Sequence, residues 1–150
     1  MRIKQRVGHS LIKALRRVPA FSTLVDHDLL LIVGASVNLY WNSGSLVFER
    51  GDSAEALYIV LSGKVRIYLD NGENETDVAT VSPGEFFGEL SLLRDEVHSK
   101  SAQASEDCEL MIIPRESFRS LISSDSTLAE HISEKMEERL KADDALQRLT

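Results

Sequence analysis

The most constraining feature of the sequence is a series of short apolar runs between residues 37 and 113. The runs are rich in Val, Ile, Leu, Tyr and Phe, and Gly, Asn, Asp or Pro interrupts them every eight to twelve residues. Turn signals at that spacing are typical of antiparallel sandwiches and barrels. The runs are VNLYW, SLVFER, ALYIVLSG, KVRIYLD, DVATVSPG, SAQASED and CELMIIP. They predict an antiparallel β-barrel or jelly roll.

Helical periodicity precedes this β segment. Residues 3–18 carry an apolar stripe at helical spacing, and Pro19 ends the pattern. Residues 26–36 predict a second helix, with Asp26 as its candidate N-cap. The stripe consists of Ile3, Val7, Leu11, Leu15 and Val18.

Helical periodicity also follows the β segment. Pro114 interrupts the last strand pattern, and two helices are expected over residues 115–124 and 126–149. The apolar stripe of the second helix either packs on the β segment of the same chain or pairs two chains into a homodimer. We therefore expect one α+β domain over residues 1–150, with N-terminal helices in 1–36, the β-barrel in 37–113 and C-terminal helices in 114–150.

Charge is unevenly distributed along the chain. Residues 1–25 hold six basic groups and no acidic group, whereas the other residues hold 11 basic and 24 acidic groups. An acidic body is unsuited to phosphate contacts, so we expect no nucleic-acid partner. The basic face of residues 1–18 is either simply solvated or contacts an acidic partner, an anionic membrane surface or the protein's own body.

The location expected from the sequence is the cytoplasm. The longest apolar runs, such as residues 29–33, are too short to cross a membrane, and the N-terminus has no signal-peptide core. Cys108 is the single cysteine, which excludes an intrachain disulfide and favours a reducing compartment. Its apolar surroundings in the sequence predict a buried, unreactive thiol.

A glycine-containing segment, GEFFGELSLLRDEVHSKSAQA at residues 84–104, is the strongest candidate for a binding loop. Gly84 and Gly88 flank two phenylalanines, and Glu89 follows directly. Without a Cβ at Gly88 the backbone can approach a ligand closely. A helix that begins after it would offer free N–H groups to a phosphate, and Glu89 would accept a hydrogen bond.

The motifs in this order resemble the cyclic nucleotide-binding domain family. The resemblance extends from about residue 15 to residue 122, and five motifs in the right order make it specific. They are VPAFSTL at 18–24, SGSLVFERGD at 43–52, ALYIVLSGKVRIYL at 56–69, SPGEFFGELSLL at 82–93 and EDCELMIIPRESF at 106–118.

The resemblance implies a non-catalytic regulatory module that binds cAMP or cGMP without a metal. It implies that Glu89 binds a ribose hydroxyl and that the helix at 126–149 covers the ligand or couples it to an effector. This chain contains no helix-turn-helix, kinase or channel segment, so the effector protein or domain is expected outside it. The pocket residues implied are Phe87, Gly88, Glu89, Leu90, His98, Ser99, Lys100 and Ser101.

The phosphate-binding arginine of the family has no counterpart in this chain. Family loops typically close with Pro-Arg-Ser/Ala-Ala-Thr/Ser, and the ungapped placement puts His98 at the arginine and Lys100 at the small alanine, while Ser101 keeps a hydroxyl. A slip of two residues would place Lys100 at the arginine but would put Gln103 and Glu106 at small or apolar positions. We therefore prefer the ungapped placement.

This replacement leaves three alternatives. Histidine is only partly charged near neutral pH and lacks the arginine fork, so loss of a charged hydrogen bond of about 1.5–3 kcal/mol would weaken binding roughly ten- to a hundredfold. His98 and Lys100 together bind a cyclic nucleotide weakly, or the pocket takes none and the domain serves as an interaction or membrane-docking scaffold. The third alternative is a different anionic or neutral ligand.

Catalysis is not expected. The four histidines are scattered, so a metal-dependent barrel enzyme is disfavoured, and no Ser-His-Asp or paired-carboxylate arrangement follows from the spacing. The histidines are His9, His27, His98 and His131.

Overall fold

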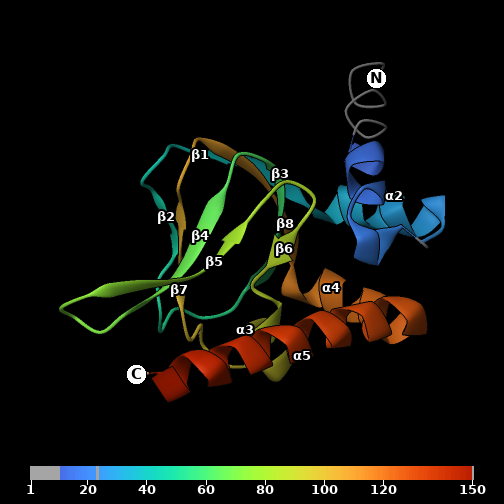
Figure 1. The fold of residues 1–150 in the computed structure, drawn as a ribbon. Coiled ribbons are helices and arrows are strands. Elements are labelled where there is room, and N and C mark those ends of the chain that lie inside the picture. The colour runs from blue at the N-terminus through green and yellow to red at the C-terminus, as the bar shows by residue number, and fades with distance from the viewer. Residues whose placement is uncertain (1–10, 23, 150) are drawn as a thin grey trace.

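The computed structural model describes residues 11–22 and 24–149, and its centre is a pair of antiparallel sheets (Figure 1). The first, called here the helix-side sheet, has the order β1 (Val37–Trp41), β8 (Cys108–Pro114), β3 (Ala56–Ser62) and β6 (Phe86–Phe87). The second, called the outer sheet, has the order β2 (Leu46–Phe48), β7 (Ser101–Ala104), β4 (Val65–Asp70) and β5 (Glu75–Val81). The predicted α+β jelly roll with flanking helices is confirmed. The described strands form two separate sheets rather than one closed barrel.

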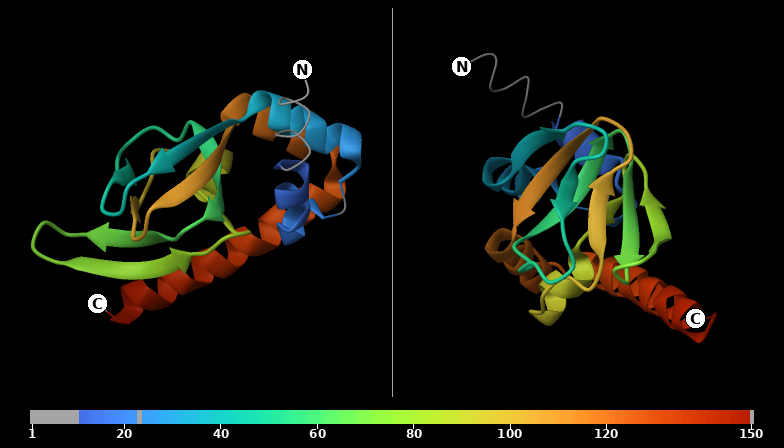
Figure 2. Two further views of the ribbon diagram at one scale, coloured as in Figure 1. Left: turned by 90° about the horizontal axis from the view of Figure 1, so that it is seen from above. Right: turned by 90° about the vertical axis from the view of Figure 1, so that its left-hand side faces the viewer.

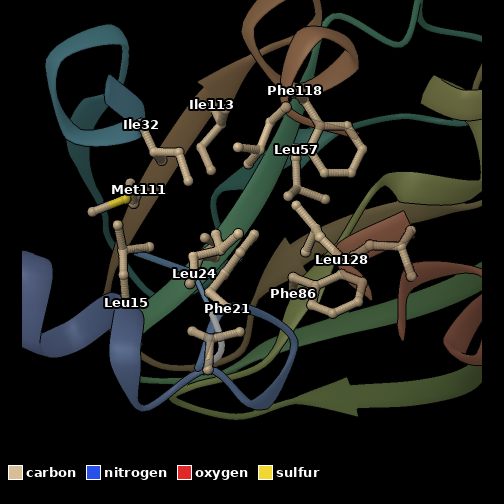
Figure 3. Packing of buried hydrophobic residues seen from close by; sticks show 14 of the residues in the cluster. Leu15, Phe21, Leu24, Ile32, Leu57, Phe86, Met111, Ile113, Phe118 and Leu128 are labelled. Carbon is tan, nitrogen blue, oxygen red and sulfur yellow. The ribbon is translucent and has the colours of Figure 1, made fainter. Parts of the chain in front are cut away.

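Strand β3, in the interior of the helix-side sheet, is buried on both faces, which explains its nearly continuous apolar sequence, whereas the edge strand β1 is largely exposed. Leu57 and Ile59 belong to the core between this sheet and the helices, whereas Val60 belongs to the core between the two sheets. Alternation along a strand sends successive side chains to opposite faces. Figure 3 shows the helix-facing core, where Leu57, Ile113 and Phe118 gather.

The N-terminal elements pack on this core. Residues 11–16 are helical and are followed by the short 3-10 helix η1 (Pro19–Phe21) and by α2 (Asp26–Ala35). Leu15 and Val18 are fully buried, so the described end of the predicted stripe packs on the protein's own body. The rest of the stripe, including Ile3 and Val7, lies outside the described residues.

The predicted N-cap at Asp26 is wrong. The N-cap of α2 is Val25, which makes no side-chain capping bond. Asp26 is the first helical residue, and its carboxylate pairs with the guanidinium of Arg16. Arg16 also donates to the carbonyl oxygen of Leu24 at 3.2 Å, so this basic residue contacts the body of the protein.

Two helices follow the last strand, as predicted. They are α4 (Arg115–Ser124) and α5 (Ser126–Leu149), separated by Asp125 alone. Leu128 and Ile132 of α5 are fully buried in the helix-facing core, whereas Leu140 is 36% exposed. The stripe of α5 therefore packs on its own chain over its first two turns. Beyond them α5 runs past α3 (Glu89–Arg94) toward the outer sheet (Figure 2).

Cys108 is buried, as the sequence predicts. Burial raises the pKa of its thiol, as expected for an inert core residue. In the part of the chain that the structure describes, no helix combines the length and the apolar character needed to cross a membrane.

Candidate functional site

The site begins where β6 ends. Phe86 and Phe87 pair with β3, Gly88 follows in the left-handed region with φ of 90°, and α3 starts at Glu89. A Cβ on Gly88 would lie 3.1 Å from the Tyr58 ring. Glycine is needed here for its backbone angle and for close packing on β3, which adds to the close approach to a ligand that the sequence predicts.

A cavity of about 110 Å³ opens beside this turn. It lies between the outer sheet, α3, the segment before β7 and the far end of α5. Seven of the eight predicted site residues line it: Phe87, Gly88, Glu89, Leu90, His98, Ser99 and Lys100. Ser101 is not in the lining, because its hydroxyl is buried and accepts a hydrogen bond from the Arg50 backbone N–H at 3.0 Å.

Glu89 is the buried acid of the cavity. It is 1% exposed, and its Oε1 accepts a hydrogen bond from Nη1 of Arg139 on α5. The same guanidinium donates from Nη2 to the carbonyl oxygen of Phe86 at 2.5 Å. The second carboxylate oxygen, Oε2, has no hydrogen-bond partner among the described residues. The acid is therefore only half satisfied.

Arg139 is the site residue that the sequence analysis did not identify. Its guanidinium lies 5.3 Å from the centre of the Phe86 ring, and its side chain lines the cavity together with Ala142. The signal in the sequence is its position, because Arg139 lies three residues after Met136 and next to Leu140 on the apolar stripe of α5, which consists of Leu128, Ile132, Met136 and Leu140. A cation on that stripe would have pointed to a buried acid opposite it.

His98 is held rigidly in the opposite wall. Its ring is 3% exposed and stacks on Phe48, with ring centres 3.6 Å apart and planes at 4°. Its backbone N–H donates to the Asp52 carbonyl at 2.9 Å, and its own carbonyl accepts from Gly51 at 2.8 Å. Nε2 has no partner among the described residues, although it lies in a residue that lines the cavity.

Burial lowers the pKa of His98 below its ordinary value of 6.5, and the opposing attraction of Asp52 is the smaller effect. The imidazole is therefore neutral at pH 7, whereas the sequence alone suggested a partly charged ring. The cationic side chains in the cavity lining are Lys100, which is half-buried, and Arg139, which is paired with Glu89.

The cavity is small because α5 lies across it. Pockets that enclose small organic ligands usually measure about 300–1,000 Å³, whereas this one measures about 110 Å³. Arg139 and Ala142 form the wall contributed by α5. Displacement of this end of α5 would enlarge the cavity without disturbing the sheets.

A second cavity, of about 350 Å³, lies between η1, the turn before β6 and the first half of α5. It contains none of the predicted site residues, and its polar lining is mainly acidic, with Glu85, Glu134 and Glu138. Throughout the described residues no group of three or more His, Cys, Asp and Glu side chains is arranged to hold a metal ion.

Known proteins share both the sequence pattern and the fold. Residues 39–125 match the family model of the cyclic nucleotide-binding domain. The cyclic AMP receptor protein of Thermus thermophilus is 35% identical over 127 residues, which cover 84% of this chain and 59% of that protein. The chain thus spans about three fifths of that relative's length.

Solved structures give the same picture. The catabolite activator protein of Thermus thermophilus superimposes with a TM-score of 0.75 and 35% identity over 87% of this chain and 62% of that one. The regulatory domain of Toxoplasma gondii PKA with cAMP gives a TM-score of 0.80 at 20% identity, over 89% of this chain and 51% of that one. The latter likeness concerns the fold alone.

Proposed function

The chain belongs to the cyclic nucleotide-binding domain family, and from that premise we propose that it is a non-catalytic regulatory module. Its ligand is a cyclic nucleotide, cAMP or cGMP, held in the cavity between the outer sheet, α3 and α5. The pocket residues are the predicted ones that line this cavity, with Arg139 added.

One observation carries the proposal: two buried polar atoms without partners belong to residues that line the same cavity. They are Oε2 of Glu89 and Nε2 of His98. Buried polar atoms are nearly always hydrogen-bonded, so a ligand that supplies the missing bonds is favoured. The carboxylate oxygen needs a donor, which a ribose hydroxyl provides, whereas an anionic phosphate suits the wall that contains His98 and Lys100.

Ligand entry requires α5 to move, and this links binding to regulation. Arg139 bonds Oε1 of Glu89 and leaves Oε2 without a partner, but its side chain also lines the cavity beside that carboxylate, so the ribose hydroxyl and Arg139 compete for the space next to Glu89. A ligand that binds only when Arg139 has withdrawn shifts the protein toward the form in which the end of α5 is displaced. An effector outside this chain would respond to that change.

Calorimetry and thermal unfolding with cAMP and cGMP test the proposal. We expect weak binding to the natural protein and roughly ten- to a hundredfold tighter binding to His98→Arg, because a charged hydrogen bond contributes about 1.5–3 kcal/mol. Absence of heat and of a thermal shift at millimolar ligand, in both proteins, would contradict it.

A second function is supported by the closed state of the cavity. The small volume and the Arg139–Glu89 pair fit a module that takes no nucleotide and serves as an interaction scaffold. In that case residues 1–18 would bind an acidic partner or an anionic membrane surface. Co-sedimentation with anionic vesicles at low salt tests the membrane version, and analytical ultracentrifugation tests pairing of two chains through α5.

A further inference from the structure

We infer that His98 makes ligand binding proton-coupled: a phosphate anion in the cavity draws a proton onto the imidazole, whereas an uncharged nucleoside does not. The inference rests on the proposed function, because it concerns the same cavity. It identifies His98 as the residue that selects an anionic ligand, and it makes that selection stronger in acid.

The geometry places an anion near His98 rather than near Glu89. Glu89 carries a buried carboxylate at the α3 end of the cavity, and like charges repel strongly in a poorly solvated site. His98 and Lys100 lie in the segment that forms another wall. The phosphate of a bound nucleotide is therefore expected at this wall, with the sugar hydroxyls toward Glu89.

Nε2 of His98 has no hydrogen-bond partner among the described residues, and we assign that contact to it. Its ring cannot turn away easily, because it is stacked on Phe48 and its backbone is bonded to Gly51 and Asp52. A neutral imidazole could donate one hydrogen bond from Nε2, but a bond from an imidazolium to an anion is about twice as strong. The bound anion therefore favours the protonated ring.

The charged groups around His98 allow this change. Asp52, from the turn between β2 and β3, already attracts the imidazolium, although burial outweighs it in the empty site. Across the cavity, Arg139 of α5 balances the charge of Glu89 in the free protein, and the proposed binding displaces this arginine. Lys100, two residues along, is the neighbouring cation in the cavity lining. A phosphate anion adds a negative charge, and its attraction then outweighs the effect of burial and favours the protonated imidazole of His98.

The expected effect follows from proton linkage. An opposite charge in direct contact raises the pKa of a cationic group by about 1–3 units. Between the pKa values of the free and the bound states, the affinity increases by up to tenfold for each unit that the pH falls. We therefore expect cAMP to bind more tightly at about pH 6 than at about pH 8, by up to about tenfold if the anion raises the pKa by about one unit and by up to about a hundredfold if it raises the pKa further.

Calorimetry of the natural protein tests whether binding of cAMP is accompanied by proton uptake. Titrations with cAMP at one pH, in two buffers that differ in ionisation enthalpy, give the number of protons taken up. We expect uptake of a fraction of a proton near neutral pH with cAMP and none with adenosine. His98→Gln, which keeps a neutral polar side chain, and His98→Arg, which is always charged, should both abolish the uptake.

Binding of cAMP by the natural protein without proton uptake would overturn the inference and leave the proposed function standing. Uptake that persists in His98→Gln, or that also accompanies adenosine, would assign the proton to another group and overturn it too. Binding by His98→Arg alone would show that the native imidazole does not hold the phosphate. Failure of both the natural protein and His98→Arg to bind would contradict the proposed function itself.

Discussion

Substitution of Arg139 by glutamine removes the guanidinium that bonds Glu89 and the Phe86 carbonyl, and it keeps a polar side chain on α5. In the free protein this leaves a carboxylate that is 1% exposed without its cation. Under the proposed function, the ligand's hydroxyl would replace Arg139 at Glu89 in the nucleotide complex. The substitution is therefore expected to weaken the free protein and to strengthen binding.

The Arg139–Glu89 contact sets the size of both the loss of stability and the gain in affinity. Removal of one partner from a fully buried ion pair costs about 3–5 kcal/mol, and a single charged hydrogen bond is worth about 1.5–3 kcal/mol. The Arg139 side chain is 23% exposed, so the lower range applies. The free energy of unfolding should fall by about 1.5–3 kcal/mol, and the affinity should rise roughly ten- to a hundredfold.

Urea unfolding and calorimetry in one buffer measure both quantities. Lys141→Gln is the matched control, since it removes one positive charge from an exposed position two residues along α5. If the pair exists only in the free state, the loss of stability and the gain in binding free energy are equal. A loss of stability accompanied by unchanged or weaker binding would refute the competition, because Arg139 would then contact the ligand or remain on Glu89.

Three further predictions concern stability. Gly63→Ala should destabilise the protein by clearly more than Gly44→Ala in urea unfolding, since both have positive φ but only the Cβ at Gly63 would lie 2.3 Å from a backbone carbonyl oxygen. Leu128→Ala should lower the free energy of unfolding by about 2–5 kcal/mol, because Leu128 is 0% exposed. Leu140→Ala should lower it far less, because Leu140 is 36% exposed, and equal losses would contradict the packing of α5. The pKa of His98 is lowered by folding, so the unfolded chain binds more protons, and stability should fall as the pH drops below about 6.5; His98→Gln should lessen that pH dependence in denaturation curves.

The strands could be predicted from the sequence because each is a short apolar run between turn residues. Strand β1 was expected at the residues where it is found, whereas β6 was missed because Phe86 and Phe87 lie within a glycine-containing loop motif and form a strand of two residues. Pairing with β3, which is distant in sequence, creates β6. Local patterns do not carry that information.

The site could be predicted only in part, for a similar reason. The order of the motifs indicated that Glu89, His98 and Lys100 share one pocket lining, and the structure brings them around one cavity. The neutral state of His98 depends on burial against Phe48, which comes from another strand. The role of Arg139 depends on the direction in which α5 leaves α4, which the helical period does not specify.

Because a single residue separates α4 and α5, a small rotation at that residue displaces the far part of α5 by a larger distance. Asp125 has an extended backbone, and its carboxylate accepts the N–H of Leu128 at 2.9 Å, so the cap travels with α5 when the joint bends. At 1.5 Å per residue, Arg139 lies about 20 Å from this joint. A tilt of about 10° would shift the guanidinium by about 3.5 Å, which exceeds the reach of a hydrogen bond. A small rotation at Asp125 is therefore enough to uncover the acid at the other end.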